Sequence, residues 1–466
     1  MFKTLKKPFL LTIFGASGDL AKLKIFPAIF ALAKQNRFPD DFAIVGFART
    51  KKSRAEFQKE FAESIRKSCE NDDFPTAFCE KTLKKLLEKV FYFSGNYADF
   101  SDFQKYFQFL QKTAPTAAKN HLAYFSVPPT VFASIAENVA KNDKNAKIIL
   151  EKPFGENQKS AEKLFHFLSR LYPPKNIFLL DHYLGKTAVQ SILNLRHNNA
   201  ILNVLLKGAQ ISQIQITAHE TVGVEDRIGY FDAVGIIKDM FQSHLTQILA
   251  MITMSIPITN SAENFQREKD AILSALDFSP RRENIFLGQA ETYPLKNSHT
   301  ETYFAAKLKI DRESWYGVPI FLRAGKKLKS KKTAVVVEFK KLPFQKKSEP
   351  NRLIFEFAPR EMLHLKLLNQ YGQSAEFHEI AAAESIACRG DDCLPDHALL
   401  LFEALSGERL HFLSFPEILA SWKITDKILN FVRREKIRPE KYSAGVLSPP
   451  GAEKVFRKNG DKWFEF

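Results

Sequence analysis

The sequence predicts an α/β domain with a doubly wound parallel sheet, followed by a larger α+β domain with a broad, mainly antiparallel sheet. Early in the chain, short apolar runs alternate with stretches of helical spacing, an arrangement typical of parallel sheets. After residue 200, apolar and polar residues alternate, as in Ile214, Ile216 and Ala218, which indicates antiparallel strands with one solvated face. We therefore expect a first domain over residues 1–180 and a second over 181–466.

The expected elements follow in order along the chain. Parallel strands are expected where apolar runs end at a turn or a polar cluster, at 9–14, 42–47, 121–127, 147–151 and 177–180. Antiparallel strands are expected at 303–310, 333–339, 353–357 and 363–367. Between the two sets, residues 234–254 form a long apolar stretch of helical length.

The composition is that of a globular protein with no membrane-embedded part. Of its 466 residues 45% are hydrophobic and 26% are charged, and no apolar run approaches the roughly 18 residues of a membrane span. The balance of 68 Lys and Arg against 52 Asp and Glu gives a formal net charge of +16, which suits nucleic acid, acidic membranes or anionic metabolites. Because the basic residues are dispersed, we interpret most of them as solvated surface and predict neither a nucleic-acid nor a membrane partner.

The four cysteines are Cys69, Cys79, Cys388 and Cys393. They form neither a CxxC pair nor a histidine-backed metal motif. We therefore expect four free thiols, a cytoplasmic location and no bound metal.

A glycine-containing turn follows the first expected strand and leads into a helix. It consists of Gly15, Ala16, Ser17, Gly18, Asp19, Leu20, Ala21 and Lys22. Such glycines let the backbone approach a pyrophosphate, whose charge then meets the amide groups at a helix start. The spacing is not GxGxxG, so an ordinary turn between strand and helix is the alternative. After the second strand, Arg49 stands where NAD enzymes typically have an acidic residue; it favours the 2′-phosphate of NADP, unless it is only a surface arginine.

Two polar clusters follow later parallel strands, at the edge where open α/β sheets bind ligands. Lys152 follows the strand 147–151, and Asp181, His182, Tyr183 and Lys186 follow the next one. If a helix begins at or just after Asp181, His182 and Lys186 share a face near its positive end and can hold a phosphate. The alternative is an N-capping Asp followed by solvated polar side chains.

The apolar stretch 234–254 carries Asp239 and His244. Charged groups in such a helix need partners. In an α-helix the two residues lie about 140° apart, so only a broad pocket could be lined by both. A lone histidine in such a stretch is more often a satisfied core residue.

Together these motifs resemble the glucose-6-phosphate dehydrogenase family over nearly the whole chain. The shared motifs are Gly-Ala-Ser-Gly-Asp-Leu-Ala at 15–21, Glu-Lys-Pro-Phe-Gly at 151–155, Asp-His-Tyr-Leu-Gly-Lys at 181–186, Ile-Ile-Lys-Asp-Met-Phe-Gln-Ser-His at 236–244 and Arg-Ala-Gly-Lys at 323–326. The resemblance implies a Rossmann domain and an α+β domain whose sheet serves dimerisation, in a homodimer or homotetramer. It also implies oxidation of glucose 6-phosphate at C1 to the phosphogluconolactone with hydride transfer to NADP, the first oxidative step of the pentose phosphate pathway.

The resemblance assigns roles to individual residues. His244 matches the general base that takes the proton of the C1 hydroxyl, and Asp181 matches the carboxylate that orients this base. The positions that match substrate ligands are Lys152, His182, Tyr183, Lys186, Glu220, Asp239, Lys326 and Lys331. The positions that match the NADP site are the turn 15–22, Arg49, Tyr97 and Lys152.

The chain departs from the family pattern at a few positions near these motifs. Thr187 stands where the family usually has Glu, and Ser243 stands where it usually has Asn. Pro395, Asp396 and His397 stand where the family often has Pro-Asp-Ala-Tyr, so the motif departs from the family pattern at His397. Two other readings stay open: a dehydrogenase of unphosphorylated glucose or of another hexose phosphate, and a basic nucleic-acid-binding protein on the same scaffold.

Overall fold

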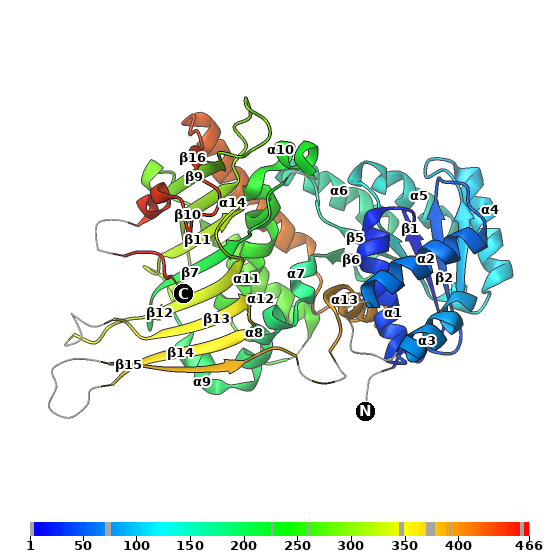
Figure 1. The fold of residues 1–466 in the computed structure, drawn as a ribbon, viewed down its shortest axis with the longest axis horizontal. Coiled ribbons are helices and arrows are strands. Elements are labelled where there is room, and N and C mark those ends of the chain that lie inside the picture. The colour runs from blue at the N-terminus through cyan, green and yellow to red at the C-terminus, as the bar shows by residue number, and fades with distance from the viewer. Residues whose placement is uncertain are drawn as a thin grey trace. The chain divides into compact units, whose positions relative to one another are not determined.

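The computed structural model describes residues 4–69, 76–224, 227–259, 261–343, 349–369, 378–388, 390, 393–456 and 461–465. The chain divides into two compact units, Met1–Lys186 with Cys388–Phe415, and Thr187–Ala387 with Pro416–Phe466 (Figure 1). The first unit thus includes a segment from late in the chain. The domain boundary expected at residue 180 stays a prediction. Within the described ranges, no helix is long and apolar enough to cross a membrane.

The first unit is built on a six-stranded, all-parallel sheet with the order β3-β2-β1-β4-β5-β6. Its strands are β1 Phe9–Phe14, β2 Phe42–Ala48, β3 Val90–Ser94, β4 His121–Phe125, β5 Lys147–Glu151 and β6 Ile177–Leu180. This is the doubly wound order whose direction reverses between β1 and β4, the point where dinucleotides bind. The predicted fold class is confirmed for this unit, although the short strand β3 was not expected.

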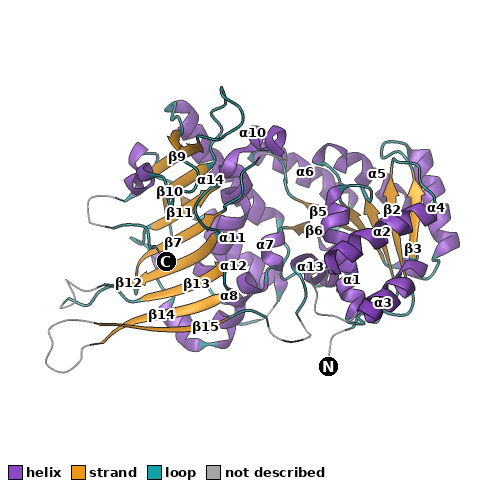
Figure 2. Cartoon of the chain, in the orientation of Figure 1, coloured by secondary structure: helices purple, strands orange, loops and turns teal. Residues whose placement is uncertain are grey.

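Helices cover both faces of this parallel sheet (Figure 2). One group, α1, α2 and α3, makes mutual contacts, and in a second group α5 contacts both α4 and α6. Helix α13 comes from the late segment and packs on α1 and α7. The helices of the unit are η1 Ala21–Ile25, α1 Phe26–Lys34, α2 Arg54–Cys69, α3 Thr76–Glu88, α4 Phe100–Thr113, η2 Ala117–Lys119, η3 Pro129–Val131, α5 Phe132–Asn142, α6 Gln158–Leu171, η4 Pro174–Asn176, α7 His182–Gly185 and α13 Asp396–Ser406.

The second unit is built on a ten-stranded sheet with the order β15-β14-β13-β12-β7-β11-β10-β9-β16, with β8 paired to β10. Among the described strands of this sheet, only β7 with β11 and β9 with β16 pair in parallel, so the predicted mainly antiparallel sheet is confirmed. The strands are β7 Ile211–His219, β8 Leu276–Asp277, β9 Ile285–Ala290, β10 Tyr303–Ile310, β11 Ile320–Gly325, β12 Lys332–Phe339, β13 Arg352–Ala358, β14 Met362–Asn369, β15 His378–Ser385 and β16 Glu440–Tyr442.

Alternating side chains of β10 serve the two faces of this sheet. Phe304 contacts Phe241 of helix η6 at a ring-centroid distance of 5.3 Å. Its neighbours Tyr303 and Ala305 belong to a separate apolar cluster with Trp463 near the C-terminus. The helices of this unit are α8 Thr187–Asn198, α9 Ala200–Leu205, α10 Ile228–Ile236, η6 Ile237–Leu245, α11 Thr246–Thr253, α12 Ala262–Ser274, η7 Arg282–Asn284, η8 Glu313–Trp315, α14 Phe415–Arg434 and η9 Pro450–Val455.

The apolar stretch 234–254 is not the single regular helix that its length predicted. Gly235 has φ 70° and ψ 168°, which breaks the helical path within α10. The following segment, η6, is a π-helix, and α11 continues as an α-helix. Because a π-helix bonds residue i to residue i+5, residues five apart stand nearly above one another. Asp239 and His244 are five apart in η6, so they share a side of this helix instead of diverging by about 140°.

The expectation of four free thiols is wrong for one pair. Cys388 and Cys393 form a disulfide in the turn before α13, with a Cα–Cα distance of 5.6 Å, which is well suited to such a bond. Cys79 is a free thiol, and Cys69 takes no part in this disulfide. The sequence did not predict this disulfide, because the two cysteines have neither a CxxC spacing nor another recognisable disulfide framework.

A buried ion pair joins α12 to α14 in the second unit. The Lys269 Nζ and Glu417 Oε2 atoms lie 2.8 Å apart, and both side chains are at most 2% exposed. Lys269 also donates to Gln247 Oε1 of α11 at 3.3 Å. The pair and this hydrogen bond therefore hold α12 and α14 to α11, which continues the helix that carries His244.

We expect Lys269→Met to lower the free energy of unfolding by about 3–5 kcal/mol, because it leaves the Glu417 carboxylate buried without its cation. Removing both charges with K269M/E417L should recover most of this loss. Urea unfolding followed by tryptophan fluorescence measures the effect, with the exposed Lys296→Met as the control. A stability of K269M equal to that of the wild type would contradict the assignment.

Candidate active site

The glycine turn after β1 has the geometry of a dinucleotide site. Gly15 has φ +85°, and a Cβ there would stand 2.0 Å from the Ser126 carbonyl oxygen, so only glycine fits. A Cβ on Gly18 would meet only the Gly15 carbonyl oxygen, at 3.2 Å. The helix that begins at Asp19 thus presents its first amide groups without a covering side chain at Gly18. These residues fit a pyrophosphate.

Arg49 and Tyr97 adjoin this turn. The Arg49 guanidinium is exposed at the end of β2, and its Cζ lies 5.8 Å from the centre of the Tyr97 ring. Burial raises the pKa of the Tyr97 phenol, while Arg49 and the Gly15 backbone act in the opposite direction. The structure therefore brings together three of the residues predicted for NADP.

The turn after β6 forms the short helix α7, for which Asp181 is the N-cap. The Asp181 carboxylate is fully buried and accepts the Tyr183 backbone N–H at 3.0 Å. The helix ends at Gly185, and Lys186 has the extended values φ −67° and ψ 124°. The prediction that His182 and Lys186 share a helix face is therefore wrong. Instead, the Lys186 Nζ lies 3.6 Å from the centre of the Tyr183 ring, in a cation–π contact.

Helix α13 packs against this turn. A Cβ on Gly185 would stand 2.6 Å from the Asp396 carbonyl oxygen, so the close packing of α7 on α13 requires glycine. The His182 and His397 rings are stacked with their centres 6.3 Å apart. Burial, with the nearby Lys24, lowers the pKa of His397 to about 4, so its ring is neutral at pH 7. The sequence alone does not predict the packing of α13 on α7, because the two helices are distant in the chain.

Glu151, the first residue of the Glu-Lys-Pro-Phe-Gly motif, is a further member of the cluster, although the motif assigned no role to it. The Tyr124 hydroxyl donates a hydrogen bond to its carboxylate, and His397 Nε2 lies 3.7 Å from its Oε1. Burial raises the pKa of Glu151; Tyr124 and Lys152 oppose this, and Asp181 reinforces it. Lys152 and Asp181, which follow the neighbouring strands β5 and β6, therefore both affect the pKa of the Glu151 carboxyl group.

In the second unit, Lys326 lies between two carboxylates. Its Nζ is 2.6 Å from Glu220 Oε2 and 3.3 Å from Asp239 Oδ2, and its side chain is 3% exposed. These three predicted residues come from the ends of β7 and β11 and from η6. Lys331 is exposed just before β12 and takes no part in this ion cluster.

His244 lies near the end of η6 and is 2% exposed. The start of this helix is held by Glu301, which precedes β10. The Glu301 Oε1 accepts a hydrogen bond from the Ile237 backbone N–H at 3.2 Å. The Glu301 backbone carbonyl oxygen accepts another from the Ile236 backbone N–H at 3.1 Å. A Cβ on Gly235 would stand 2.3 Å from the same Oε1. Glu301 and Gly235 were not predicted, because neither belongs to a motif with known chemistry.

The parallel sheet, the glycine turn and the charged groups at the strand ends define an oxidoreductase that binds a nicotinamide dinucleotide. Two family models match the chain: "Glucose-6-phosphate dehydrogenase, NAD binding domain" over residues 12–191 and "Glucose-6-phosphate dehydrogenase, C-terminal domain" over residues 193–464. The chain therefore belongs to the glucose-6-phosphate dehydrogenase family, as its motifs predicted, and NADP is its cofactor.

Individual relatives agree with this assignment. Glucose-6-phosphate 1-dehydrogenase of Schizosaccharomyces pombe is 32% identical, over 98% of this chain and 95% of its own. The solved enzyme of Mycobacterium avium superimposes with a TM-score of 0.85 at 30% identity, over 98% of this chain and 99% of its own. A glucose-6-phosphate dehydrogenase in complex with glucose 6-phosphate superimposes with a TM-score of 0.89 at 27% identity, and each chain is fully covered.

The start of η6 gives a prediction about pH. Burial raises the pKa of Glu301 from 4.5 to about 7, with the backbone N–H groups and Lys238 opposing. The folded protein thus binds this proton more tightly than the unfolded chain, and the free energy of unfolding should fall by about 3 kcal/mol between pH 5 and pH 8 from this group.

Glu301→Gln keeps an acceptor for Ile237 but cannot ionise, so urea unfolding at pH 5, 6.5 and 8 should show a flatter profile than the wild type. Glu263→Gln, which changes an exposed carboxylate of α12, is the matched control. Parallel pH profiles of E301Q and the wild type would exclude a raised pKa at Glu301.

Proposed function

We propose that this chain oxidises glucose 6-phosphate at C1 to the 6-phosphogluconolactone, and that the residues predicted from the motifs form its active site. Three features support this proposal, and all occur in a chain of the glucose-6-phosphate dehydrogenase family. They are a glycine turn suited to a pyrophosphate, a cluster of lysine and imidazole side chains after β6, and a buried histidine on η6. NADP, when bound, supplies the acceptor for the hydride from C1.

In this mechanism, His244 takes the proton of the C1 hydroxyl while the hydride leaves C1. An imidazole suits this step because its ordinary pKa lies near 6.5. Asp181 orients the imidazole and stabilises the imidazolium that forms. Its complete burial and the N-cap bond from the Tyr183 backbone N–H support this role, because they fix the position of the carboxylate.

The phosphate is held by His182, Tyr183 and Lys186. The residues that contact the sugar hydroxyls or the phosphate are Lys152, Glu220, Asp239 and Lys326, and Lys331 approaches the substrate from the later strands. The cation–π contact of Lys186 with Tyr183 supports the first set, because it fixes the position of the ammonium group. The ion cluster of Lys326 supports the second set, because its carboxylates can exchange their lysine for hydroxyl donors.

NADPH absorbance with NADP and either glucose 6-phosphate or glucose tests this function. We expect rapid turnover with the phosphorylated sugar alone. Lys186→Met should raise KM for glucose 6-phosphate far more than it lowers kcat, whereas Lys175→Met, an exposed lysine before β6, should change neither. Equal turnover of both sugars would contradict the proposed phosphate pocket. Absence of turnover would contradict the proposed function.

We expect His244→Asn to lower kcat by at least about 10³-fold with little change in KM, because it removes a group that acts only in the transition state. Circular dichroism should show an unchanged fold. His166→Asn, an exposed histidine of α6, is the control for loss of an imidazole. A kcat of H244N within a few-fold of the wild type would exclude His244 as the base.

Arg49 should determine the preference for NADP over NAD. Arg49→Ala should raise KM for NADP at least tenfold and leave KM for NAD nearly unchanged, because only NADP carries the 2′-phosphate that a guanidinium binds. The exposed Arg170→Ala is the control. A similar loss of affinity for both cofactors would show that Arg49 acts on another part of the dinucleotide.

We further propose that the enzyme is a cytoplasmic homodimer or homotetramer. The edge strand β15 supports an oligomer, because its backbone is paired on one side only, with β14, and its described side chains are mostly exposed. The cytoplasmic location rests on the cysteine pattern of the sequence, which has no CxxC pair or recognisable disulfide framework, although Cys388 and Cys393 form a disulfide. Sedimentation velocity of the purified protein would give the number of subunits.

A further inference from the structure

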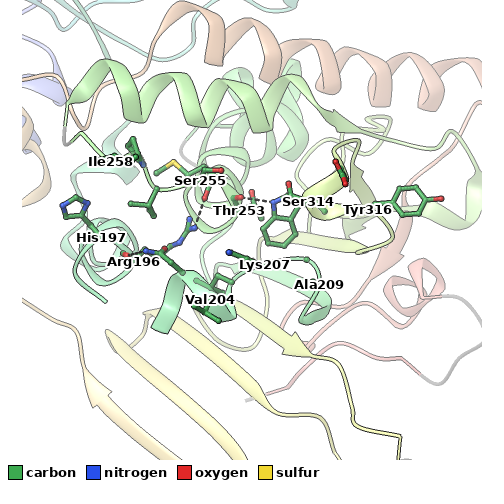
Figure 3. A pocket seen from close by; sticks show the side chains of 18 of the residues that line it. Arg196, His197, Val204, Lys207, Ala209, Thr253, Ser255, Ile258, Ser314 and Tyr316 are labelled. Carbon is green, nitrogen blue, oxygen red and sulfur yellow. Dashed lines mark hydrogen bonds between the residues drawn. The ribbon is translucent and has the colours of Figure 1, made fainter. Parts of the chain in front are cut away.

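The second unit contains a large pocket that none of the predicted active-site residues lines. Its volume is about 1330 Å³, above the 300–1,000 Å³ that is usual for sites of drug-sized ligands. It is bounded by the end of α8, by α9 and the turn after it, by the loop after α11 and by η8 (Figure 3). This is room enough for an elongated small molecule.

The pocket has an apolar wall and an apolar rim. Trp315 is buried in the wall, and its Nε1 donates to the Thr253 carbonyl oxygen at 2.9 Å, which fixes the ring. Val204, Ile258 and Tyr316 stand on the rim and are 60%, 103% and 86% exposed. Three large apolar side chains around one opening are characteristic of a binding site more than of ordinary surface.

Arg196 brings a positive charge to the pocket. It is 3% exposed, and its two terminal nitrogens donate to the Met251 and Met254 carbonyl oxygens, both at 2.7 Å, at the end of α11. Burial lowers its pKa to about 10. In the part of the chain that the structure describes, no carboxylate pairs with this guanidinium. A buried cation without an anionic partner is costly.

Two buried polar atoms of the lining have no hydrogen-bond partner among the described residues. They are the Nε of Arg196 and the Oδ1 of Asn203. Asn203 is anchored next to Arg196, because its Nδ2 donates to the Arg196 carbonyl oxygen at 2.8 Å. Buried polar groups nearly always have hydrogen-bond partners in native proteins. The two atoms therefore indicate a ligand that offers an acceptor to Arg196 Nε and a donor to Asn203 Oδ1.

The charge around the opening is also mostly positive. Lys207 and Lys340 are exposed there, and Glu313 is the one carboxylate among the lining residues. Lys340 is held in place by the Ala209 carbonyl oxygen, to which its Nζ donates at 3.0 Å. We propose that this pocket binds a small amphipathic anion, a carboxylate or phosphate monoester with an extended apolar body. Lys207 and Arg196 attract the anionic group, and Val204, Ile258 and Tyr316 contact the apolar body.

Isothermal titration with decanoate, decyl phosphate and decyltrimethylammonium tests the proposal on the full-length enzyme. Saturating NADPH and glucose 6-phosphate are present, so that the active site is already filled. We expect both anions to bind at least tenfold more tightly than the cation of equal chain length. The tighter of the two anions identifies the preferred head group.

Lys207→Glu and Val204→Asp should each weaken binding of the anions at least tenfold. Both residues are exposed, so neither substitution removes a buried contact. Lys296→Glu, an exposed lysine of the same unit outside the pocket, should leave binding unchanged. The proposal is overturned by absence of binding, by equal affinity for anion and cation, or by an equal loss in K296E and K207E.

Discussion

The arrangement of charged groups in the second unit depends on how one helix begins. Gly235 turns the chain with a positive φ, and the Glu301 carboxylate occupies the space that a side chain on Gly235 would take. From this start η6 continues as a π-helix, which places Asp239 and His244 on one side. Asp239 in turn meets Lys326. A bulkier residue at 235 would displace the glutamate and with it the first N–H bonds of the helix.

Burial controls the charge around the signature turn of the first unit. It raises the pKa of Glu151 and of Asp396 and lowers that of His397, so each of these groups is pushed toward its neutral form. Lys186 lies over an aromatic ring and keeps its ammonium group near the surface of this cluster. Burial thus reduces the negative charge of the carboxyl groups around this turn.

The sequence predicted those parts of the site that are local in the chain. The glycine turn, Arg49 and the Asp181 cluster each follow a strand, so strand ends alone place them at the ligand edge of the sheet. The π-helix could not be predicted, because apolar spacing does not distinguish it from an α-helix. His397 and Glu301 were missed since their importance comes from contacts with residues distant in sequence. The Cys388–Cys393 bond was missed because two cysteines five apart have no diagnostic spacing.

Helix α13 shows why the first unit cannot be understood from its own stretch of chain. Leu400, Leu401 and Phe402 are buried in the same apolar core as β1 and α1, although they come from the late segment. Gln35 donates to the Cys393 carbonyl oxygen and so fixes the entry to α13 on the other side of that core. The turn that carries Asp181 packs on this helix. The packing of this turn therefore needs a contact that forms only after the second unit's sheet has been synthesised, and such long-range contacts are slow to form in folding.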